Sequence, residues 1–589
     1  GGFALPVRAE RVAVFGGLIQ SRTANIWGGI MKQTVFLHAL MAALLLVATC
    51  PAGAETIKPL TTQERAAYAA LSPFEFKNFL AEKASAQSKP MLDAGRGNPN
   101  FINTRARLAF SMLQRFAVES SSGAGNDDEL GYPPVAAKGM AAQFKAFLAK
   151  ETDRKTASFL LQCMAYSQEK LGIEPDRFAA DMVDAILGDH YPTPSRMLTT
   201  PATIVEAYLK SIHFPNGKSE SSFDLFATEG ATAAMIYVFN TLKENFLLVP
   251  GDAIAIITPI FSPYLEIPLL NDFQLHPIYV EGSESAGWQV SDKELNKLKD
   301  KKIKALFMVN PMNPGAVGMN RESVEKIAAV IRQDRPELMV LTDTVYCPFV
   351  DEFHDLLEAV PQNCIGVFSY SKYFGVTGWR LGVVFVQRDN IFDRMIKALP
   401  ADQKRLLNVR YSIDSPEPEK IGFAERLLMD SREVALAHTG GLSTPQQCIM
   451  ALFSLYDLTD EGHAYKKSIQ ALLKKRMANL YGPLKMNPPE GPGQTLYYNM
   501  INIRNLAEQR HGAEFANALV KTWSPFDFLL QLATQHQTVL LPGIGFAGPE
   551  WSVRISLANL PDTDYTRIGN NIVSTIDAFD ESWARSEKK

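Results

Sequence analysis

What this 589-residue chain lacks already excludes several classes of protein. It has only five cysteines and no C-x-x-C pair, so neither a disulfide framework nor a metal site is indicated. A net charge of −4 argues against a nucleic-acid partner. No apolar run reaches the roughly 20 residues that a membrane-spanning helix needs. With 46% hydrophobic and 21% charged residues, the chain has the composition of a globular protein with more than one core.

The N-terminal residues have the pattern of an export signal. Met31-Lys32 gives a positive start, an apolar run extends from Val35 to Ala48, and Ala52-Gly53-Ala54 supplies an A-x-A end. These features predict a Sec-type signal peptide over residues 31–54, cleaved before Glu55, within a leader that spans residues 1–54. We therefore expect a periplasmic protein. The alternatives are a buried N-terminal helix and a cytoplasmic location.

A polar turn between two apolar runs, residues 364–368 and 381–386, carries the strongest chemical signal. Its polar side chains include two serines, a lysine and an arginine: Ser369, Ser371, Lys372 and Arg380. A lysine among buried strands loses hydration, so its amine becomes neutral and nucleophilic more readily. An arginine beside a serine hydroxyl suits a doubly charged phosphate. A nucleophilic amine near a phosphate clamp is what pyridoxal phosphate (PLP) requires. A solvent-facing lysine with a salt-bridged arginine is the alternative.

The pattern S-x-S-K-x(7)-R-x-G resembles the cofactor segment of fold-type I PLP enzymes, the aspartate aminotransferase family. The resemblance covers roughly residues 90 to 560 and implies that Lys372 holds PLP, with Ser369, Ser371 and Arg380 around its phosphate. Apolar strands alternating with helices independently predict an α/β fold with a mostly parallel sheet between helices. In such a sheet a ligand lies at the carboxyl ends of the strands.

The resemblance and the alternation together predict how the chain divides into domains. Residues 55–200 would form an N-terminal arm and the first part of a smaller α+β domain. Residues 201–440 would form the large PLP-binding domain, with a charged insertion or oligomer contact near 397–440. Residues 441–589 would complete the small domain.

Further cofactor contacts follow from the family resemblance. Asp343 ends a predicted strand and would bind the ring nitrogen, while Asn313, in an N-P-x-N-P motif, and Tyr346 would bond the ring oxygen. Catalysis would rest on Lys372, Asp343 and Tyr346. Taken alone, Asp343 could instead cap a helix.

Other predicted cofactor contacts lie at the ends of strands or in turns. Ala231 and Thr232 open a helix, whose free N–H groups would face the phosphate. Phe261 would stack on the ring, or else be a core phenylalanine. Tyr191 would reach the cofactor phosphate of a neighbouring subunit, or else be a packed turn residue.

The substrate contacts are predicted from charge and backbone. Arg554 lies inside an apolar strand and therefore needs a partner; by resemblance it would clamp the substrate α-carboxylate, beside Asn313. Gly95 and Gly172 would present backbone to the substrate. Arg96 and Lys77 are candidates for a second carboxylate, although a solvated lysine is the alternative.

The loop Gly95-Arg96-Gly97-Asn98-Pro99-Asn100 resembles, more narrowly, the aspartate 4-decarboxylases (aspartate β-decarboxylases). This resemblance implies conversion of L-aspartate to L-alanine and carbon dioxide, with side aspartate aminotransferase activity. An aminotransferase acting on aspartate or another amino acid is the alternative. A non-enzymatic PLP-binding regulator is disfavoured because Lys372 and Asp343 are both present. The family also implies a homodimer that assembles into a larger homo-oligomer.

Overall fold

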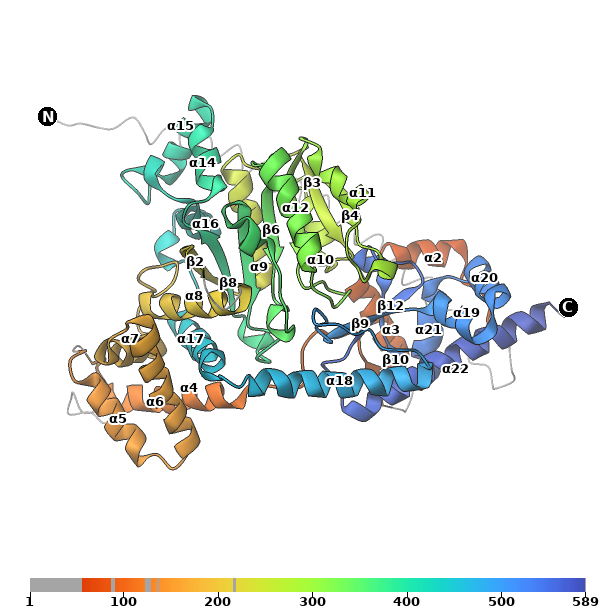
Figure 1. The fold of residues 1–589 in the computed structure, drawn as a ribbon, viewed down its shortest axis with the longest axis horizontal. Coiled ribbons are helices and arrows are strands. Elements are labelled where there is room, and N and C mark those ends of the chain that lie inside the picture. Colours follow the sequence, from red (N-terminus) through yellow and green to blue (C-terminus); the bar gives the residue numbers. More distant parts are fainter. Residues whose placement is uncertain (1–55, 86–89, 122–128, 135–136, 215–218, 588–589) are drawn as a thin grey trace. The chain divides into compact units, whose positions relative to one another are not determined.

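The structure, a computed structural model, describes residues 56–85, 90–121, 129–134, 137–214 and 219–587 (Figure 1). The predicted signal peptide, residues 31–54, lies outside the described residues. Residues 58–589 form one compact unit, and the domain boundaries within it stay a prediction.

Helices and strands alternate through the middle of the chain. The strands are β1 (Leu92–Asp93), β2 (Phe223–Thr228), β3 (Ala253–Thr258), β4 (His276–Glu281), β5 (Ile303–Val309), β6 (Met339–Asp343), β7 (Cys364–Ser369), β8 (Gly382–Gln387), β9 (Tyr498–Asn502), β10 (Thr538–Val539), β11 (Leu541–Pro542) and β12 (Ser552–Ser556). The helices up to the end of the large sheet are α2 (Thr62–Ala69), α3 (Pro73–Ser85), α4 (Thr104–Ser121), α5 (Met140–Lys150), α6 (Arg154–Leu171), α7 (Pro175–Leu187), α8 (Thr199–His213), α9 (Ala231–Glu244), α10 (Pro263–Glu266), α11 (Asp292–Leu295), α12 (Arg321–Asp334) and α13 (Leu356–Ala359). The later helices are α14 (Ile391–Ala398), α15 (Ala401–Tyr411), α16 (Phe423–Ser431), α17 (Thr444–Thr459), α18 (Ala464–Leu484), α19 (Ile503–His511), α20 (Ala513–Thr522), α21 (Pro525–His536) and α22 (Asp562–Ser586).

A seven-stranded sheet in the order β2-β8-β7-β6-β5-β3-β4 carries the site. Strand β8 is antiparallel to both neighbours, and the remaining pairs are parallel. All strands except β8 therefore run in one direction, and their carboxyl ends meet at one edge of the sheet. Because β8 is reversed, its amino end lies at that same edge. The predicted mostly parallel α/β sheet is confirmed.

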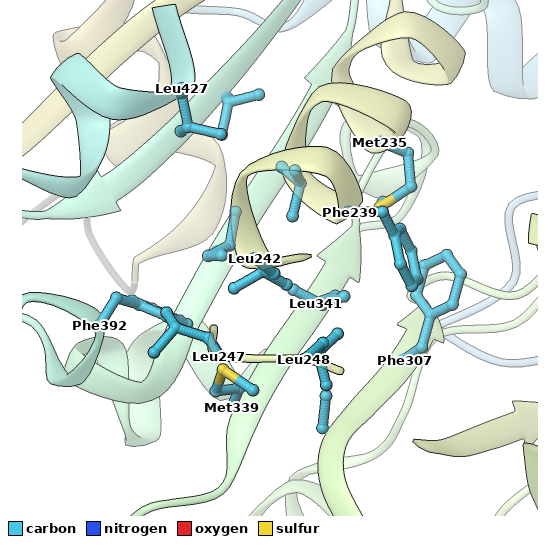
Figure 2. Close-up of a cluster of buried hydrophobic side chains, with 14 of the residues drawn as sticks. Met235, Phe239, Leu242, Leu247, Leu248, Phe307, Met339, Leu341, Phe392 and Leu427 are labelled. Carbon is cyan, nitrogen blue, oxygen red and sulfur yellow. The ribbon is translucent and has the colours of Figure 1, made fainter. Parts of the chain in front are cut away.

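One face of this sheet is covered by α9 and α16 through a continuous apolar cluster. Figure 2 shows Met235, Phe239 and Leu242 of α9 beside Phe307 of β5 and Leu341 of β6. Full burial of such a side chain contributes about 1.5–3 kcal/mol. This packing fixes α9 against the sheet, so its first residues stay at the edge where the strands end.

A second, antiparallel sheet in the order β11-β12-β9 supplies the opposite wall of the site. In its register Arg554 of β12 pairs with Met500 of β9, and Ser556 pairs with Tyr498. The long helices α18 and α22 pack side by side close to this sheet (blue in Figure 1). Arg554 is thus held in the middle of a short paired strand rather than on a loop.

The charged segment 397–440 folds mainly as helices α15 and α16, which an ionic cluster ties to α9. Arg410 of α15 lies 2.9 Å from Asp430 of α16 and 3.2 Å from Glu244 of α9. Burial raises the pKa of Asp430 to about 6, although Arg410 opposes this shift. Whether the segment is an insertion or an oligomer contact stays a prediction.

Two further features concern the cysteines and the helices. Cys163, Cys347, Cys364 and Cys448 are free and buried. None of the described helices combines the length and the apolar character needed to cross a membrane.

Candidate active site

A cavity of about 270 Å³ lies where the strands of the large sheet end. Eleven of the residues singled out from the sequence line it: Ala231, Thr232, Phe261, Asn313, Asp343, Tyr346, Ser369, Ser371, Lys372, Arg380 and Arg554. They come from seven separate stretches of chain. The topology brings them together because each stretch adjoins a strand end, apart from Arg554, which the small sheet supplies.

Lys372 follows β7, and its amine points into the cavity. Its Nζ donates a hydrogen bond to the carbonyl oxygen of Gly97 at 2.9 Å. Burial lowers the pKa of the Lys372 amine, and the nearby positive charges of Arg554 and Arg380 lower it further. A larger fraction of the amine is therefore neutral and able to act as a nucleophile or base than for a lysine in water.

Asp343, the last residue of β6, is a buried carboxylate without a basic side chain bonded to it in the described residues. Its Oδ2 accepts a hydrogen bond from the Tyr264 hydroxyl at 2.7 Å, and its Oδ1 accepts one from the Val345 N–H at 3.0 Å. Burial raises the pKa of Asp343 to about 6, while the bond from Tyr264 opposes that rise. A protonated ring nitrogen placed against it would supply the missing positive charge.

An anion cradle lies at the start of α9. Gly230 precedes the helix with φ 90°, and no side chain caps the free N–H groups that follow. A Cβ on Gly230 would lie 2.6 Å from Nη2 of Arg380, so glycine leaves the room that this guanidinium occupies. Helix N–H groups, the positive end of the helix dipole and an arginine fork together suit a phosphate.

Arg554 is a fully buried cation that no carboxylate in the described residues neutralises. It is 1% exposed, and its guanidinium carbon lies 4.3 Å from the ring centre of Tyr498 and 4.8 Å from that of Phe546. Its Nη1 donates to Oδ1 of Asn313 at 3.2 Å, and its Nη2 donates to the carbonyl of Gly95 at 2.8 Å.

The Nε atom of Arg554 is buried with no partner in the described protein. Burial lowers the pKa of this guanidinium, while Tyr498, the other nearby tyrosines and the Asp93 carboxylate oppose the shift. A buried donor left in this state costs free energy, and a carboxylate entering the cavity would satisfy it.

These groups fit pyridoxal phosphate. Lys372 would hold the cofactor's aldehyde carbon, Asp343 would face the ring nitrogen, and the cradle formed by α9 and Arg380 would hold the phosphate. Phe261, Asn313 and Tyr346 line the same cavity and would contact the ring. A mixed sheet with this set at its carboxyl edge defines a fold-type I PLP enzyme.

Comparison with known sequences places the chain in a family. The sequence profile described as "Aminotransferase class I and II" matches residues 206–572, more than half of the chain. The chain belongs to the aminotransferase class I and II family, whose enzymes use PLP.

Individual relatives agree with that family. A protein of Pseudomonas sp described as "Bifunctional aspartate aminotransferase and L-aspartate beta-decarboxylase" is 42% identical over 515 residues, covering 87% of this chain and 97% of the relative. An aspartate aminotransferase of Streptomyces avermitilis is 31% identical over 183 residues, 30% of this chain and 42% of the relative. The crystal structure of an aspartate aminotransferase from Thermotoga maritima shares the fold, with a TM-score of 0.50 and 16% identity, covering 88% of this chain and all of that one.

Two predicted site residues are not brought to the cavity. Tyr191 is 66% exposed, with its ring 6.2 Å from that of His438, so its predicted reach into a neighbouring subunit remains a prediction. Gly172 was expected beside the substrate. It instead ends helix α6 with φ 67°, and its N–H donates to the carbonyls of Ser167 and Gln168. A left-handed helix end is what favours glycine there.

Gly95, Arg96 and Lys77 are not among the residues that line the cavity. Asp93 binds both cations: its Oδ2 lies 2.9 Å from Nε of Arg96 and 3.7 Å from Nζ of Lys77. The other oxygen accepts the Gly95 N–H at 3.0 Å. The candidates for a second substrate carboxylate are therefore already paired, and they brace the loop whose Gly95 carbonyl binds Arg554.

Sequence reasoning missed several lining residues: Phe74, Gly97, Asn98, Tyr264, Val309, Val345, Thr377 and Tyr498. Gly97 and Asn98 lie in the same glycine-rich loop as Gly95. Tyr264 lies three residues after Phe261, on the next short helix, so spacing could have suggested it. No local pattern points to Tyr498, which reaches the cavity only through the pairing of β9 with β12.

Proposed function

We propose that this protein converts L-aspartate to L-alanine and carbon dioxide with PLP as its cofactor, and that it has aspartate aminotransferase activity as a side reaction. The observation that carries the proposal is the buried guanidinium of Arg554, in the same cavity as Lys372 and Asp343, whose Nε has no hydrogen-bond partner and which has no ion-pair partner among the described residues. It calls for a substrate carboxylate beside a nucleophilic amine. The name of the Pseudomonas relative supports both activities.

The charges that line the cavity favour loss of the second carboxylate. The described lining of the cavity contains three basic side chains, Lys372, Arg380 and Arg554. Arg380 would hold the phosphate, Arg554 the α-carboxylate, and Lys372 acts at the reacting carbon. No further lining cation is left to stabilise a β-carboxylate in the ground state, so its departure as neutral carbon dioxide is not opposed by a strong ion pair.

Each residue then has a definable task. When bound, PLP supplies the electron sink for negative charge that develops on substrate carbons. The neutral amine of Lys372 removes the proton from the α-carbon. Asp343, steadied by the Tyr264 hydroxyl, keeps a proton on the ring nitrogen. Arg554 orients the substrate through its α-carboxylate.

Product analysis tests the proposal directly. The PLP-loaded protein is incubated with L-aspartate and no 2-oxo acid, and alanine and carbon dioxide are measured over many turnovers. We expect near-equal, catalytic amounts of both products, and neither from a Lys372→Ala variant. Turnover that appears only after 2-oxoglutarate is added, without carbon dioxide, would show an aminotransferase alone.

Export to the periplasm is a separate proposal, supported by the signal-like pattern of residues 31–54. Cell fractionation with N-terminal sequencing tests it, and we expect a periplasmic protein that begins at Glu55. Recovery of the uncleaved chain in the cytoplasm would contradict it.

We also propose a homodimer that assembles further, in which Tyr191 contacts the neighbouring active site. The exposed position of Tyr191 supports this arrangement. Mixing Tyr191→Phe and Lys372→Ala subunits tests it. If Tyr191 serves the neighbour, one site in each hybrid dimer regains both residues and activity is partly restored, whereas a residue acting within its own subunit gives no gain.

A further inference from the structure

Tyr498 occupies a distinctive place in the cavity wall. It is the first residue of β9, is 2% exposed, and lines the cavity between Lys372 and Arg554. A Cβ built on Gly97 would lie 2.9 Å from the Tyr498 hydroxyl and 3.2 Å from the Lys372 amine. The hydroxyl and the amine therefore face the same small volume, which glycine leaves open.

The lining residues that have no assigned role indicate what the substrate side chain would contact. Seven lining residues have no role assigned so far toward the cofactor or the substrate α-carboxylate: Phe74, Gly97, Asn98, Val309, Val345, Thr377 and Tyr498. Two of these residues carry a hydroxyl, Thr377 and Tyr498. The Thr377 carbonyl accepts a hydrogen bond from Arg380 at 3.0 Å, on the phosphate side, whereas Tyr498 lies beside Lys372 and Arg554. The β-carbon of an aspartate held by Arg554 and Lys372 would lie on the side of the cavity that Tyr498 lines.

The proposed reaction requires an acid at that carbon. Loss of carbon dioxide breaks the bond between the β-carbon and its carboxyl carbon, and the electron pair stays with the substrate and the cofactor's electron sink. Alanine then forms when the β-carbon gains one proton, which comes finally from water. Lys372 is already engaged with the α-carbon proton, so a second proton carrier separates the two events.

Resting on the proposed function, we propose that Tyr498 is the acid that delivers this proton to the β-carbon. The O–H bond of Tyr498 breaks as the new C–H bond forms, and the phenolate recovers its proton from water. Tyr346 supports the phenolate, because its hydroxyl donates its one hydrogen to the Tyr498 oxygen at 3.2 Å, so in this arrangement that hydrogen is not directed to the ring oxygen. The guanidinium of Arg554, 4.3 Å from the ring centre, adds positive charge on the other side.

The acid strengths of the two tyrosines agree with this assignment. Burial alone would raise the pKa of Tyr498, but the charges of Lys372 and Arg554 and the bond from Tyr346 bring it below the ordinary value. Burial raises the pKa of Tyr346 well above its ordinary value. Of the two hydroxyls, Tyr498 is the better proton donor.

A Tyr498→Phe holoenzyme tests the inference, because phenylalanine keeps the ring against Arg554 and removes only the hydroxyl. Tyr481→Phe is the matched control: Tyr481 is also buried, and its hydroxyl bonds Asn499 of the same strand at 2.7 Å, outside the cavity lining. Three quantities are measured for each protein: carbon dioxide release, transamination with 2-oxoglutarate, and the dissociation constant of succinate, an unreactive dicarboxylate.

We expect Tyr498→Phe to lose about 10²-fold or more of its carbon dioxide release, the usual contribution of a general acid, while transamination and succinate binding stay near wild type. An ultraviolet pH titration should show one tyrosinate that forms below the ordinary pH range in wild type and in Tyr481→Phe, and that is absent from Tyr498→Phe.

Three results would overturn the inference. Wild-type carbon dioxide release by Tyr498→Phe would leave Lys372 as the acid. An equal loss of carbon dioxide release, transamination and succinate binding would make Tyr498 a support for Arg554 only. If the wild-type protein itself releases no carbon dioxide, both the proposed function and this inference are wrong. That failure can be told apart from a failure of the inference alone, because it is seen in the wild-type protein before any variant is made.

Discussion

Replacing Arg554 with methionine should separate activity from stability. Methionine fills a similar volume without charge, so it removes the guanidinium that would hold the substrate carboxylate. A charge-assisted hydrogen bond contributes about 1.5–3 kcal/mol, and a bidentate pair therefore about 3–6 kcal/mol. At about 1.4 kcal/mol per factor of ten, kcat/KM for aspartate should fall roughly 10²- to 10⁴-fold.

The free energy of unfolding should change little in the same variant. No carboxylate in the part of the chain that the structure describes forms an ion pair with Arg554, and its Nε has no partner there, so removing the guanidinium relieves a desolvation cost. The loss of the bonds to Asn313 and Gly95 offsets that gain. We expect the Arg554→Met protein to unfold within about 2 kcal/mol of wild type.

Arg476→Met is the matched control, because Arg476 is also buried but is paired. Its Nε lies 2.9 Å from Asp562, and its Nη1 donates to the Leu557 carbonyl at 3.0 Å. This variant should lose stability and keep its kinetics. Steady-state assays and denaturant unfolding on both variants measure the contrast. If Arg554→Met kept wild-type kcat/KM, or lost as much stability as Arg476→Met, the assigned role of Arg554 would be refuted.

Three further changes probe the cofactor side. In cofactor-free protein, folding raises the pKa of Asp343 from 3.8 to about 6. The protonated carboxyl therefore stabilises the folded state fully below pH 4, and this stabilisation is lost as the pH rises to 6. Between these pH values the free energy of unfolding of wild type should fall by roughly 3 kcal/mol relative to that of Asp343→Asn, as measured by unfolding at a series of pH values. Tyr264→Phe removes the 2.7 Å bond to Asp343 and should weaken PLP binding by about tenfold or more, measured by absorbance titration. Gly230→Ala places a methyl group 2.6 Å from Nη2 of Arg380 at φ 90°, so PLP should dissociate faster in dialysis, whereas retention at the wild-type rate would remove Arg380 from the cradle.

The part of the site that follows the strands could be predicted from the sequence for a simple physical reason. A short run of continuous apolar residues in an α/β pattern becomes a strand buried on both faces, as β3, β6 and β7 are. The polar residue just after such a run must then lie at the carboxyl edge. Asp343 and Lys372 reached the cavity by this rule, which needs no knowledge of distant contacts.

The residues that could not be predicted depend on partners far away in the chain. Tyr498 meets Lys372 only because two sheets face each other across the cavity. Lys77 and Arg96 have the charge expected of substrate ligands, but their sequence positions do not reveal that Asp93 binds both. Gly172 is predicted to present its backbone to the substrate, whereas the structure places it at the left-handed end of helix α6, which the sequence pattern did not indicate.

The charged side chains of the cavity lack partners of opposite charge in the part of the protein that the structure describes, which affects both the stability of the protein and its choice of ligand. Within the described residues, the half-buried Lys372 and the buried Arg554 have no carboxylate within ion-pair distance, and the buried Asp343 has no base bonded to it. Each arrangement lowers stability in the absence of ligand, since a buried charge without compensation is costly. A phosphate, a ring nitrogen that carries a proton and a substrate carboxylate each supply one missing charge. Because such ligands bind the folded state alone, their binding raises the free energy of unfolding and offsets the loss of stability caused by the unpaired charges. The same lack of internal pairing that makes the cavity unfavourable in isolation therefore selects the charges of its ligands.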